Sequence, residues 1–263
     1  MTRPSLRHWV VLTTGLVVAT VLWAHGSQAG TASRDAAAPQ REPLAGRVIV
    51  LDPGHQLGNH NFPRKISRLV PAGGFRKPCN TTGTSTNRGY PEATFVWRVA
   101  RLAQRRLERL GAEVVLTRQV NSPRRWGPCV DSRGRAGNRI GADLKLSIHA
   151  DGSHAAGARG FHVIAPADRR RWTRDIFQPS RRLAKDLRAA LLAAGVPRAN
   201  YIAGGDGLDT RGDLATLNLS DVPTAMVELG NMRHPRDARR MTSPRGRAAY
   251  AAALVRAVRA HLS

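Results

Sequence analysis

Four side chains in this sequence can bind a metal ion or transfer a proton, and each stands beside a predicted strand end or helix start. His55 follows the apolar run 47–51 and the turn-forming sequence Asp-Pro-Gly. His149 ends a second apolar run, Glu228 lies inside a third, and Glu92 stands near the start of a predicted helix. Ligand sites form where the carboxyl ends of parallel strands meet at one edge of a sheet. These four residues are therefore expected to converge.

Two imidazoles and two carboxylates together suit a catalytic zinc site. Such a site takes three protein ligands of the His₂Glu type and leaves the fourth position to water. Zinc lowers the pKa of that water and polarises a carbonyl, while a second carboxylate takes up the proton and returns it to the leaving amine. We therefore predict one Zn²⁺ ion bound by His55, Glu92 and His149, with Glu228 as the catalytic base.

Each of these residues also has a simpler explanation. A single histidine after a strand is usually a loop residue, and the helix dipole favours any acidic residue, such as Glu92, in a first helical turn. Glu228 is harder to explain structurally, because an unpaired carboxylate within an apolar strand is costly to bury. His154 is an alternative ligand because it lies close to His149 in the sequence. Three further histidines are expected at the surface or behind the ligands: His60, His162 and His234.

Strand-like and helix-like segments alternate along the chain from residue 47. Short apolar runs predict strands at 47–51, 113–118, 143–148, 160–165 and 223–229. Apolar residues at helical spacing and helix-stop signals predict helices at 91–110, 131–140, 176–194 and 245–262. This alternation predicts a single α/β domain with a mostly parallel twisted sheet and helices on both faces. Segment 56–89, rich in Gly, Pro, Asn and Thr, is predicted to be a long loop.

The four residues lie in a series of motifs that resembles the zinc-dependent N-acetylmuramoyl-L-alanine amidases of type 3. The resemblance runs in order from about residue 47 to the C-terminus. Its motifs are Val-Ile-Val-Leu-Asp-Pro-Gly-His55, the Glu92 helix, Leu-Thr-Arg118, Asp131-Ser-Arg133 with Ala136-Gly-Asn138, Ala142-Asp-Leu-Lys-Leu-Ser-Ile-His149-Ala-Asp, and Pro223-Thr-Ala-Met-Val-Glu228-Leu-Gly-Asn-Met. The long insert around Cys79 is similar to that of actinobacterial members. We expect a catalytic domain alone, without a wall-binding repeat.

The resemblance implies both the reaction and the site. In the family the matching His, Glu and His bind zinc, and the matching glutamate of the last strand is essential for catalysis. The implied reaction is hydrolysis of the amide bond between N-acetylmuramic acid and L-alanine in peptidoglycan or muramyl peptides. Segment 211–218 is similar to the one beside the family's substrate groove, so Arg211 and Asn218 are candidate substrate-binding residues.

The N-terminal segment predicts export. Basic residues precede an apolar run at 9–24, and Ser27 and Ala29 suit cleavage before residue 30. We predict a signal peptide at 1–29, a flexible linker at 30–45 and the catalytic domain at 46–263. An uncleaved membrane anchor is the alternative, because the apolar run is only slightly shorter than a spanning helix. In either case the domain is expected outside the cytoplasmic membrane, in the periplasm, cell wall or medium, with no stable membrane insertion after cleavage.

The two cysteines, Cys79 and Cys129, predict a disulfide. An even pair in an exported protein favours a bridge, and neither cysteine has a histidine or second cysteine beside it at metal-ligand spacing. In the chain-entropy account such a bridge stabilises the fold by ~4 kcal/mol. Its expected role is to hold two long loops together.

The formal net charge of +24 is typical of nucleic-acid-binding proteins, but two features argue against that function. The basic residues are mostly arginines spread along the chain, and aromatic residues make up 5%, too few for a base-stacking platform. We expect no nucleic-acid partner; anionic wall polymers, or simply a solvated surface, account for the charge. Two other functions stay open: a non-catalytic peptidoglycan-binding protein, and a zinc peptidase acting within the stem peptide. A monomer is expected.

Overall fold

The computed structural model describes residues 42–263. The predicted signal peptide at 1–29 and most of the predicted linker at 30–45 lie outside these residues. Leu44, which the linker prediction includes, is buried, and its amide donates to the Leu110 carbonyl at 2.8 Å. The packed chain therefore begins before the predicted boundary at residue 46. Among the described residues, no helix combines the length and apolar character needed to cross a membrane.

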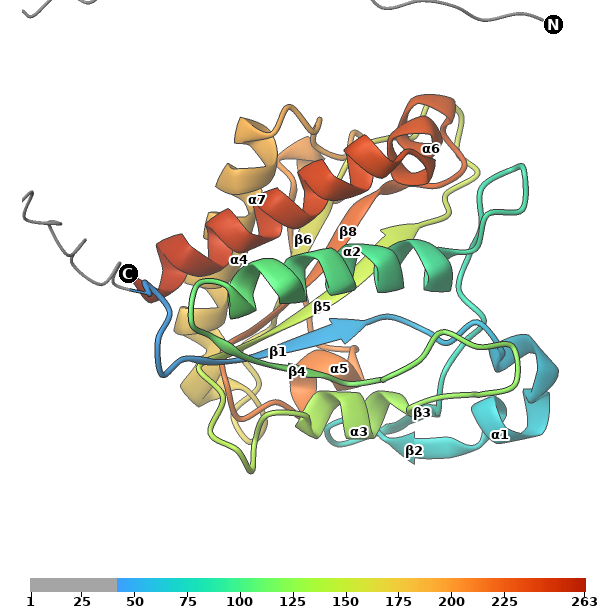
Figure 1. Cartoon of the computed structure of the whole chain (residues 1–263). Coiled ribbons are helices and arrows are strands. Elements are labelled where there is room, and N and C mark those ends of the chain that lie inside the picture. Colours follow the sequence, from blue (N-terminus) through green and yellow to red (C-terminus); the bar gives the residue numbers. More distant parts are fainter. Residues whose placement is uncertain (1–41) are drawn as a thin grey trace, which may run out of the picture. The chain divides into compact units, whose positions relative to one another are not determined.

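A six-stranded sheet forms the centre of the described chain, in the order β4-β1-β5-β8-β6-β7 (Figure 1). The strands are β1 (Val48–Pro53), β4 (Glu113–Leu116), β5 (Leu144–Asp151), β6 (His162–Pro166), β7 (Leu208–Arg211) and β8 (Thr224–Asn231). Neighbouring strands are parallel, except that β6 runs antiparallel to β8. The predicted mostly parallel sheet is confirmed. β7 was not predicted, because this half-exposed edge strand carries a single apolar residue.

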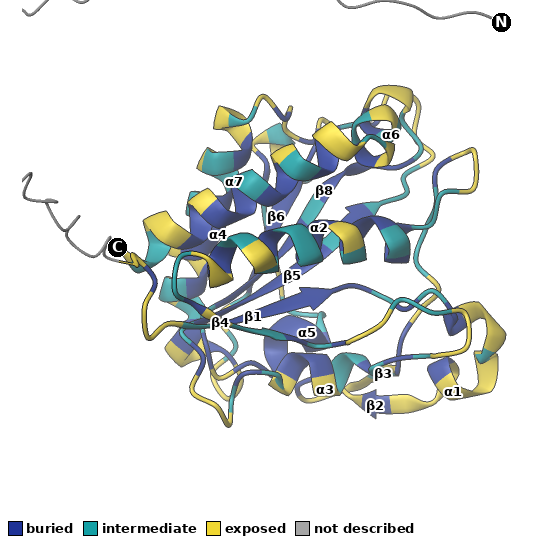
Figure 2. Ribbon diagram, in the orientation of Figure 1, coloured by how far each residue is buried: buried dark blue, intermediate teal, exposed yellow. Residues whose placement is uncertain are grey.

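Helices cover both faces of the sheet, as predicted. On one face lie α2 (Glu92–Glu108), α4 (Arg174–Ala193) and α7 (Pro244–Leu262), and on the other α3 (Val130–Arg135) and α5 (Ala215–Asn218) (Figure 1). α2 forms where it does because its buried apolar residues recur every three or four positions, as at Val96, Val99 and Ala103. The strands between the two layers are largely buried (Figure 2). The short α6 (Pro235–Thr242), which was not predicted, packs against α7.

The long loop predicted at 56–89 contains short regular elements. They are the 3-10 helix η1 (Asn59–Asn61), α1 (Pro63–Ser67), and an antiparallel hairpin of β2 (Leu69–Pro71) and β3 (Arg76–Pro78). Gly73 and Gly74, both at φ 89°, form the hairpin turn in a conformation that favours glycine. The predicted Cys79–Cys129 disulfide is present and joins the end of the hairpin to the start of α3. Elements of three to five residues are too short to produce a recognisable hydrophobic period.

Helix α3 ends at Arg135, well before the predicted end at 140. The chain turns at Gly137, where φ is 100°. A Cβ atom at this position would lie 3.1 Å from Val50 and 3.2 Å from Ala142, so the turn allows the chain to pack closely against β1. This close approach between distant segments is a tertiary constraint that local helical spacing does not reveal.

A lysine in the middle of β5 is fully buried. The Lys145 ammonium donates to the carbonyls of Arg133 and Gly134 at the end of α3, and so links the helix to the sheet. Burial lowers the pKa of Lys145 to about 7, against the opposing effect of the Asp52 and Asp221 carboxylates. Lys145 therefore fixes α3 to the sheet, but its ammonium group loses a proton more readily in the folded chain than in the unfolded chain.

This burial predicts how stability changes with pH. An unfolded lysine keeps its proton up to its ordinary pKa of about 10.5, so between pH 7 and 10.5 the unfolded chain binds more protons than the folded one. The destabilising effect of Lys145 is therefore largest below pH 7 and disappears as the pH rises through this window. We expect the unfolding free energy of the wild type, relative to Lys145→Met, to rise by at most ~1.4 kcal/mol per pH unit. Denaturant titrations of both proteins at several pH values measure this difference, and a flat difference would contradict the assignment.

Candidate metal centre

The four residues singled out from the sequence meet at the carboxyl edge of the sheet. His55 lies two residues after β1, His149 lies in β5, and Glu92 is the first residue of α2. Glu228 lies in β8 and stands beside His149 in the parallel register of β5 and β8. Both histidines and Glu228 line one cavity of about 270 Å³. Three strands and one helix thus contribute one chemical group each.

Glu92 lies between the two imidazoles. Its Oε2 is 3.2 Å from Nε2 of His55, and its Oε1 is 3.1 Å from Nδ1 of His149. One nitrogen or oxygen atom from each of the three residues lies within 4.8 Å of the others, so together they can hold one metal ion. His154, the alternative ligand, is exposed and is not part of this group. The position of His149 is thus better suited to metal binding.

Backbone groups fix the orientation of the Glu92 carboxylate. Oε2 accepts from the amide of Thr84 at 3.0 Å, and Oε1 accepts from the amide of Ala150 at 3.1 Å. The carboxylate is buried, and Ala150 directly follows the second histidine. Hydrogen bonds of this kind orient metal ligands and tune their affinity. The carboxylate is therefore held in place by the chain itself.

The His55 ring is oriented by a backbone carbonyl. Its Nδ1 lies 3.1 Å from the Thr81 carbonyl oxygen, which also accepts from the buried Asn59 side chain at 2.7 Å. When Nδ1 carries the proton and donates to this oxygen, the lone pair of Nε2 faces Glu92. This arrangement selects the tautomer that a metal ligand requires.

Two glycines allow the ligands to approach one another. A Cβ atom at Gly54 would lie 2.2 Å from Cε1 of His149. At Gly83, where φ is 77°, a Cβ atom would lie 2.9 Å from both Oε2 of Glu92 and Cδ2 of His55. Any side chain at these positions would displace a ligand, so the packing around the centre requires glycine.

The two glutamates have opposite electrostatic environments. Burial raises the pKa of Glu92, but His55 and His149 outweigh that effect and hold it well below its usual range. Burial opposes the protonated form of His55, yet the Glu92 carboxylate raises its pKa above the ordinary value. Burial raises the pKa of Glu228 well above its usual range, and the Glu92 and Asp151 carboxylates add to the effect while Arg211 opposes it. One carboxylate is thus suited to bind a cation and the other to hold a proton.

Glu228 also differs from Glu92 in its contacts. Its Oε2 is buried and has no hydrogen-bond partner among the described residues. Buried polar atoms are normally paired, and an exception calls for an explanation such as a catalytic role. Glu228 lines the same cavity as the two histidines, so a water molecule or a substrate group in that cavity can supply the partner.

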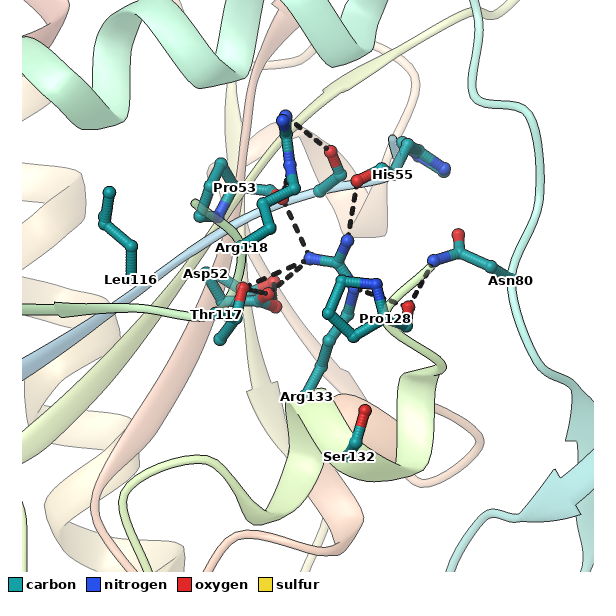
Figure 3. Close-up of polar contacts among 12 residues, drawn as sticks. Asp52, Pro53, His55, Asn80, Leu116, Thr117, Arg118, Pro128, Ser132 and Arg133 are labelled. Atoms are coloured by element: carbon teal, nitrogen blue, oxygen red, sulfur yellow. Dashed lines mark hydrogen bonds and ion pairs between the residues drawn. The ribbon is translucent and has the colours of Figure 1, made fainter. Parts of the chain in front are cut away.

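A buried network of arginines supports the loop that carries His55 (Figure 3). Arg133, in α3, forms an ion pair with Asp52 at 2.5 Å, and it donates to the carbonyls of Pro53 at 2.8 Å and His55 at 2.6 Å. His55 has a left-handed backbone, with φ at 53°, which is unusual for a residue other than glycine. The bond from Arg133 holds the carbonyl of this strained residue in place.

A second arginine completes the support from the other side. Arg118 donates to the carbonyls of Pro53 and Gly54, and also to Ala93 in the first turn of α2. Asp52, at the base of the loop, is fully buried and accepts from Thr117 at 2.6 Å and Ser147 at 2.7 Å. Burial raises the pKa of Asp52, but Arg133 and these hydroxyls hold it well below its usual range. The loop before His55 is thus fixed at three consecutive carbonyls.

These supporting residues were not assigned a role from the sequence. Arg118 and Arg133 appeared only within motifs that resemble a family, and Asp52 only as part of a turn. A usable signal was present at Lys145, a charged residue inside an apolar strand like Glu228. No sequence pattern showed which carbonyls the arginines would reach, because their partners lie far away along the chain.

The two candidate substrate-binding residues lie in different surroundings. Arg211 is exposed at the end of β7 and forms a two-point ion pair with Asp213, at 2.8 and 2.7 Å. Asn218 is fully buried in α5, and its amide nitrogen donates to the carbonyls of Ala72 and Gly212. Direct contact with substrate stays a prediction for Arg211. For Asn218 it also stays a prediction, and in this structure its side chain holds the hairpin against the segment after β7.

The chain is similar to several known proteins along most of its length. Residues 49–260 match the family described as N-acetylmuramoyl-L-alanine amidase (Amidase_3). The chain is 44% identical to the N-acetylmuramoyl-L-alanine amidase Rv3717 of Mycobacterium tuberculosis over 223 residues. This match covers 84% of this chain and 88% of that protein. Crystal structures of the N-acetylmuramyl-L-alanine amidase Ami1 match with a TM-score of 0.77 in both cases. The Mycobacterium abscessus enzyme is 43% identical, and the match covers 84% of this chain and 100% of that enzyme's chain. The Mycobacterium smegmatis enzyme is 39% identical, and the match covers 83% of this chain and 98% of that enzyme's chain.

The support that Arg133 gives to His55 can be tested through metal affinity. Arg133→Lys keeps a positive charge beside Asp52, but one nitrogen cannot reach both this carboxylate and the His55 carbonyl. We expect the dissociation constant for zinc to rise about 10- to 100-fold, as for other residues that orient metal ligands. Competition with a chromophoric chelator measures this constant. Ser147→Ala is the matched control, since it removes a donor to Asp52 without touching the loop, and equal affinities in both variants would contradict the role.

Proposed function

The chain belongs to the N-acetylmuramoyl-L-alanine amidase family, and from this premise we propose that it is a zinc-dependent peptidoglycan amidase. It hydrolyses the amide bond between N-acetylmuramic acid and L-alanine. Zn²⁺ is proposed to bind to His55, Glu92 and His149, with Glu228 as the catalytic base. One observation carries the proposal: two imidazoles and a carboxylate converge within 4.8 Å, beside a second carboxylate with a buried, unpartnered oxygen.

The donor set fits catalytic zinc. Two imidazole nitrogens and one carboxylate oxygen match the His₂Glu ligand type, which leaves a further position open to water. Zinc bound by these residues would lower the pKa of a water ligand and polarise the substrate carbonyl. The ligands also have the supporting hydrogen bonds that zinc sites usually show: His55 to the Thr81 carbonyl, and the Thr84 and Ala150 amides to Glu92.

Glu228 is placed to move the proton. It lines the cavity beside both histidines, where an attacking water and the substrate amide must lie together. Its carboxylate takes up the proton of the attacking water, and then gives that proton to the alanine nitrogen as the carbon–nitrogen bond breaks. The raised pKa of Glu228 supports this role, because the carboxyl group must hold the proton between the two events.

The substrate sets the place of action. Peptidoglycan lies outside the cytoplasmic membrane, so we propose that the domain works there as an exported monomer. The Cys79–Cys129 bridge is consistent with an oxidising compartment. The export signal itself lies outside the described residues.

Product analysis tests the reaction directly. Incubation of the purified protein with a muramyl peptide is expected to release a peptide with a free N-terminal L-alanine, as detected by mass spectrometry. A chelator should stop the release, and added zinc should restore it, because zinc supplies the Lewis acid. A cut within the stem peptide would instead indicate a peptidase, and intact substrate with a zinc-loaded protein would indicate a binding protein.

The role of Glu228 predicts a separation between metal binding and catalysis. Glu228→Gln keeps the size of the side chain but cannot accept a proton, so kcat should fall by about 10²- to 10⁴-fold. Zinc content, measured by elemental analysis, should stay at one ion per chain. Glu92→Gln serves as the contrast, since it should lose zinc as well as activity. A Glu228 variant with normal turnover would exclude the residue as the base.

A further inference from the structure

Two exposed aromatic side chains lie together beside the hairpin turn. Phe75 is 36% exposed just before β3, and Trp172 is 37% exposed just before α4. A Cβ atom at Gly74 would lie 3.3 Å from Nε1 of Trp172, and the guanidinium of Arg169 lies 5.4 Å from the Phe75 ring centre. Segments almost a hundred residues apart in the chain thus place two aromatic rings and one arginine at a single surface, which we call the aromatic patch.

The aromatic patch has the composition of a binding surface. Phe75 and Trp172 are the only aromatics among the strongly exposed large hydrophobic residues of the described chain. Aromatic side chains supply large contact areas and are enriched where proteins bind other molecules. Arg169 adds a positive charge, because its guanidinium lies 5.4 Å from the Phe75 ring centre. Two aromatic surfaces and one guanidinium therefore stand together.

The patch borders the cavity of the metal centre. Lys77, two residues after Phe75 in the hairpin, lines that cavity. Two residues of extended chain span about 7 Å, so Phe75 lies about this distance from a residue of the cavity wall. The Lys77 ammonium donates to the carbonyl of Asp213 at 2.8 Å. On the other side of this contact, a Cβ atom at Gly212 would lie 3.2 Å from Cδ of Arg169. The patch and the cavity are thus joined by one layer of residues.

The substrate must extend out of the cavity in two directions. When the scissile amide lies beside Glu228, the stem peptide leaves on the side of the alanine nitrogen and the glycan on the side of the muramic acid. The peptide carries charged carboxylates, whereas a glycan offers pyranose rings with apolar C–H faces and polar acetamido and hydroxyl groups. Aromatic rings match the C–H faces, and the guanidinium of Arg169 is a donor group for an acetamido or hydroxyl oxygen.

We propose that Phe75, Trp172 and Arg169 form a subsite for the glycan strand of peptidoglycan, where sugars linked to the reacting muramic acid pack on the two rings. This inference rests on the proposed amidase function and adds to it a preference for substrates with a glycan chain. Arg211, which forms an ion pair with Asp213, stays the candidate for the charged stem peptide.

Kinetics with two substrates of equal peptide test the subsite. One probe is a muramyl peptide with a single sugar, and the other carries the same peptide on a tetrasaccharide of alternating N-acetylglucosamine and N-acetylmuramic acid. We expect the wild type to have the lower KM for the longer probe. In the double variant Phe75→Ala, Trp172→Ala that KM should rise about tenfold, with kcat and the KM for the shorter probe unchanged. The matched control is Ile140→Ala, Leu192→Ala, which removes exposed apolar side chains elsewhere.

Three results would overturn the subsite: no change in either KM, an equal rise for both probes, or the same rise in the control variant. A second measurement is independent of catalysis: titration of the wild type and the double variant with a peptide-free tetrasaccharide, followed by isothermal titration calorimetry. Binding by the wild type alone supports the subsite, and equal binding overturns it. If the wild type cleaves neither probe, the amidase proposal fails, while this titration still decides whether the patch binds glycan.

Discussion

The buried ion pair between Asp52 and Arg133 is the interaction on which the candidate metal centre depends. A charge without water is costly to bury unless it is paired and fully hydrogen-bonded, and loss of one partner leaves the other uncompensated. Asp52 therefore fixes the position of Arg133 in the interior, with further bonds from Thr117 and Ser147. The same guanidinium holds the carbonyl of the left-handed His55. One group thus connects the stability of the sheet centre with the orientation of a metal ligand.

The environments of the two glutamates divide the chemistry between them. Glu92 is enclosed by two imidazoles and two backbone amides, all of which favour its ionised form. Glu228 stands beside His149 in the next strand but has a buried oxygen without a partner, and nearby carboxylates disfavour its charge. Environments that move two pKa values in opposite directions are the usual way in which a site separates its acid–base group from its other carboxylates.

The sequence predicted the parts of the molecule that depend on local pattern. Buried strands and long amphipathic helices have a clear period, and Glu228 was conspicuous because a charge inside an apolar strand requires a reason. The early end of α3 was not predictable, because Gly137 responds to the packing of Val50 and Ala142. Asn218 was a candidate from the resemblance alone, and its bonds to the carbonyls of Ala72 and Gly212 were not predicted. The hairpin was missed because its strands have three residues each. For Gly137 and Asn218 the deciding contact joins distant segments.

The hairpin of β2 and β3 is fastened at its base. The amides of Cys79 and Asn80 donate to the carbonyls of Arg68 and Ile66, and the Cys79–Cys129 bridge fastens the same point to α3. Insertions or substitutions near Phe75 therefore change the surface of the hairpin turn. They leave the proposed metal ligands His55, Glu92 and His149, which lie outside the hairpin, in place. Since loops on a rigid scaffold accept sequence change most readily, this hairpin is the place where related enzymes can diverge in the wall polymers they accept while the catalytic apparatus is inherited unchanged.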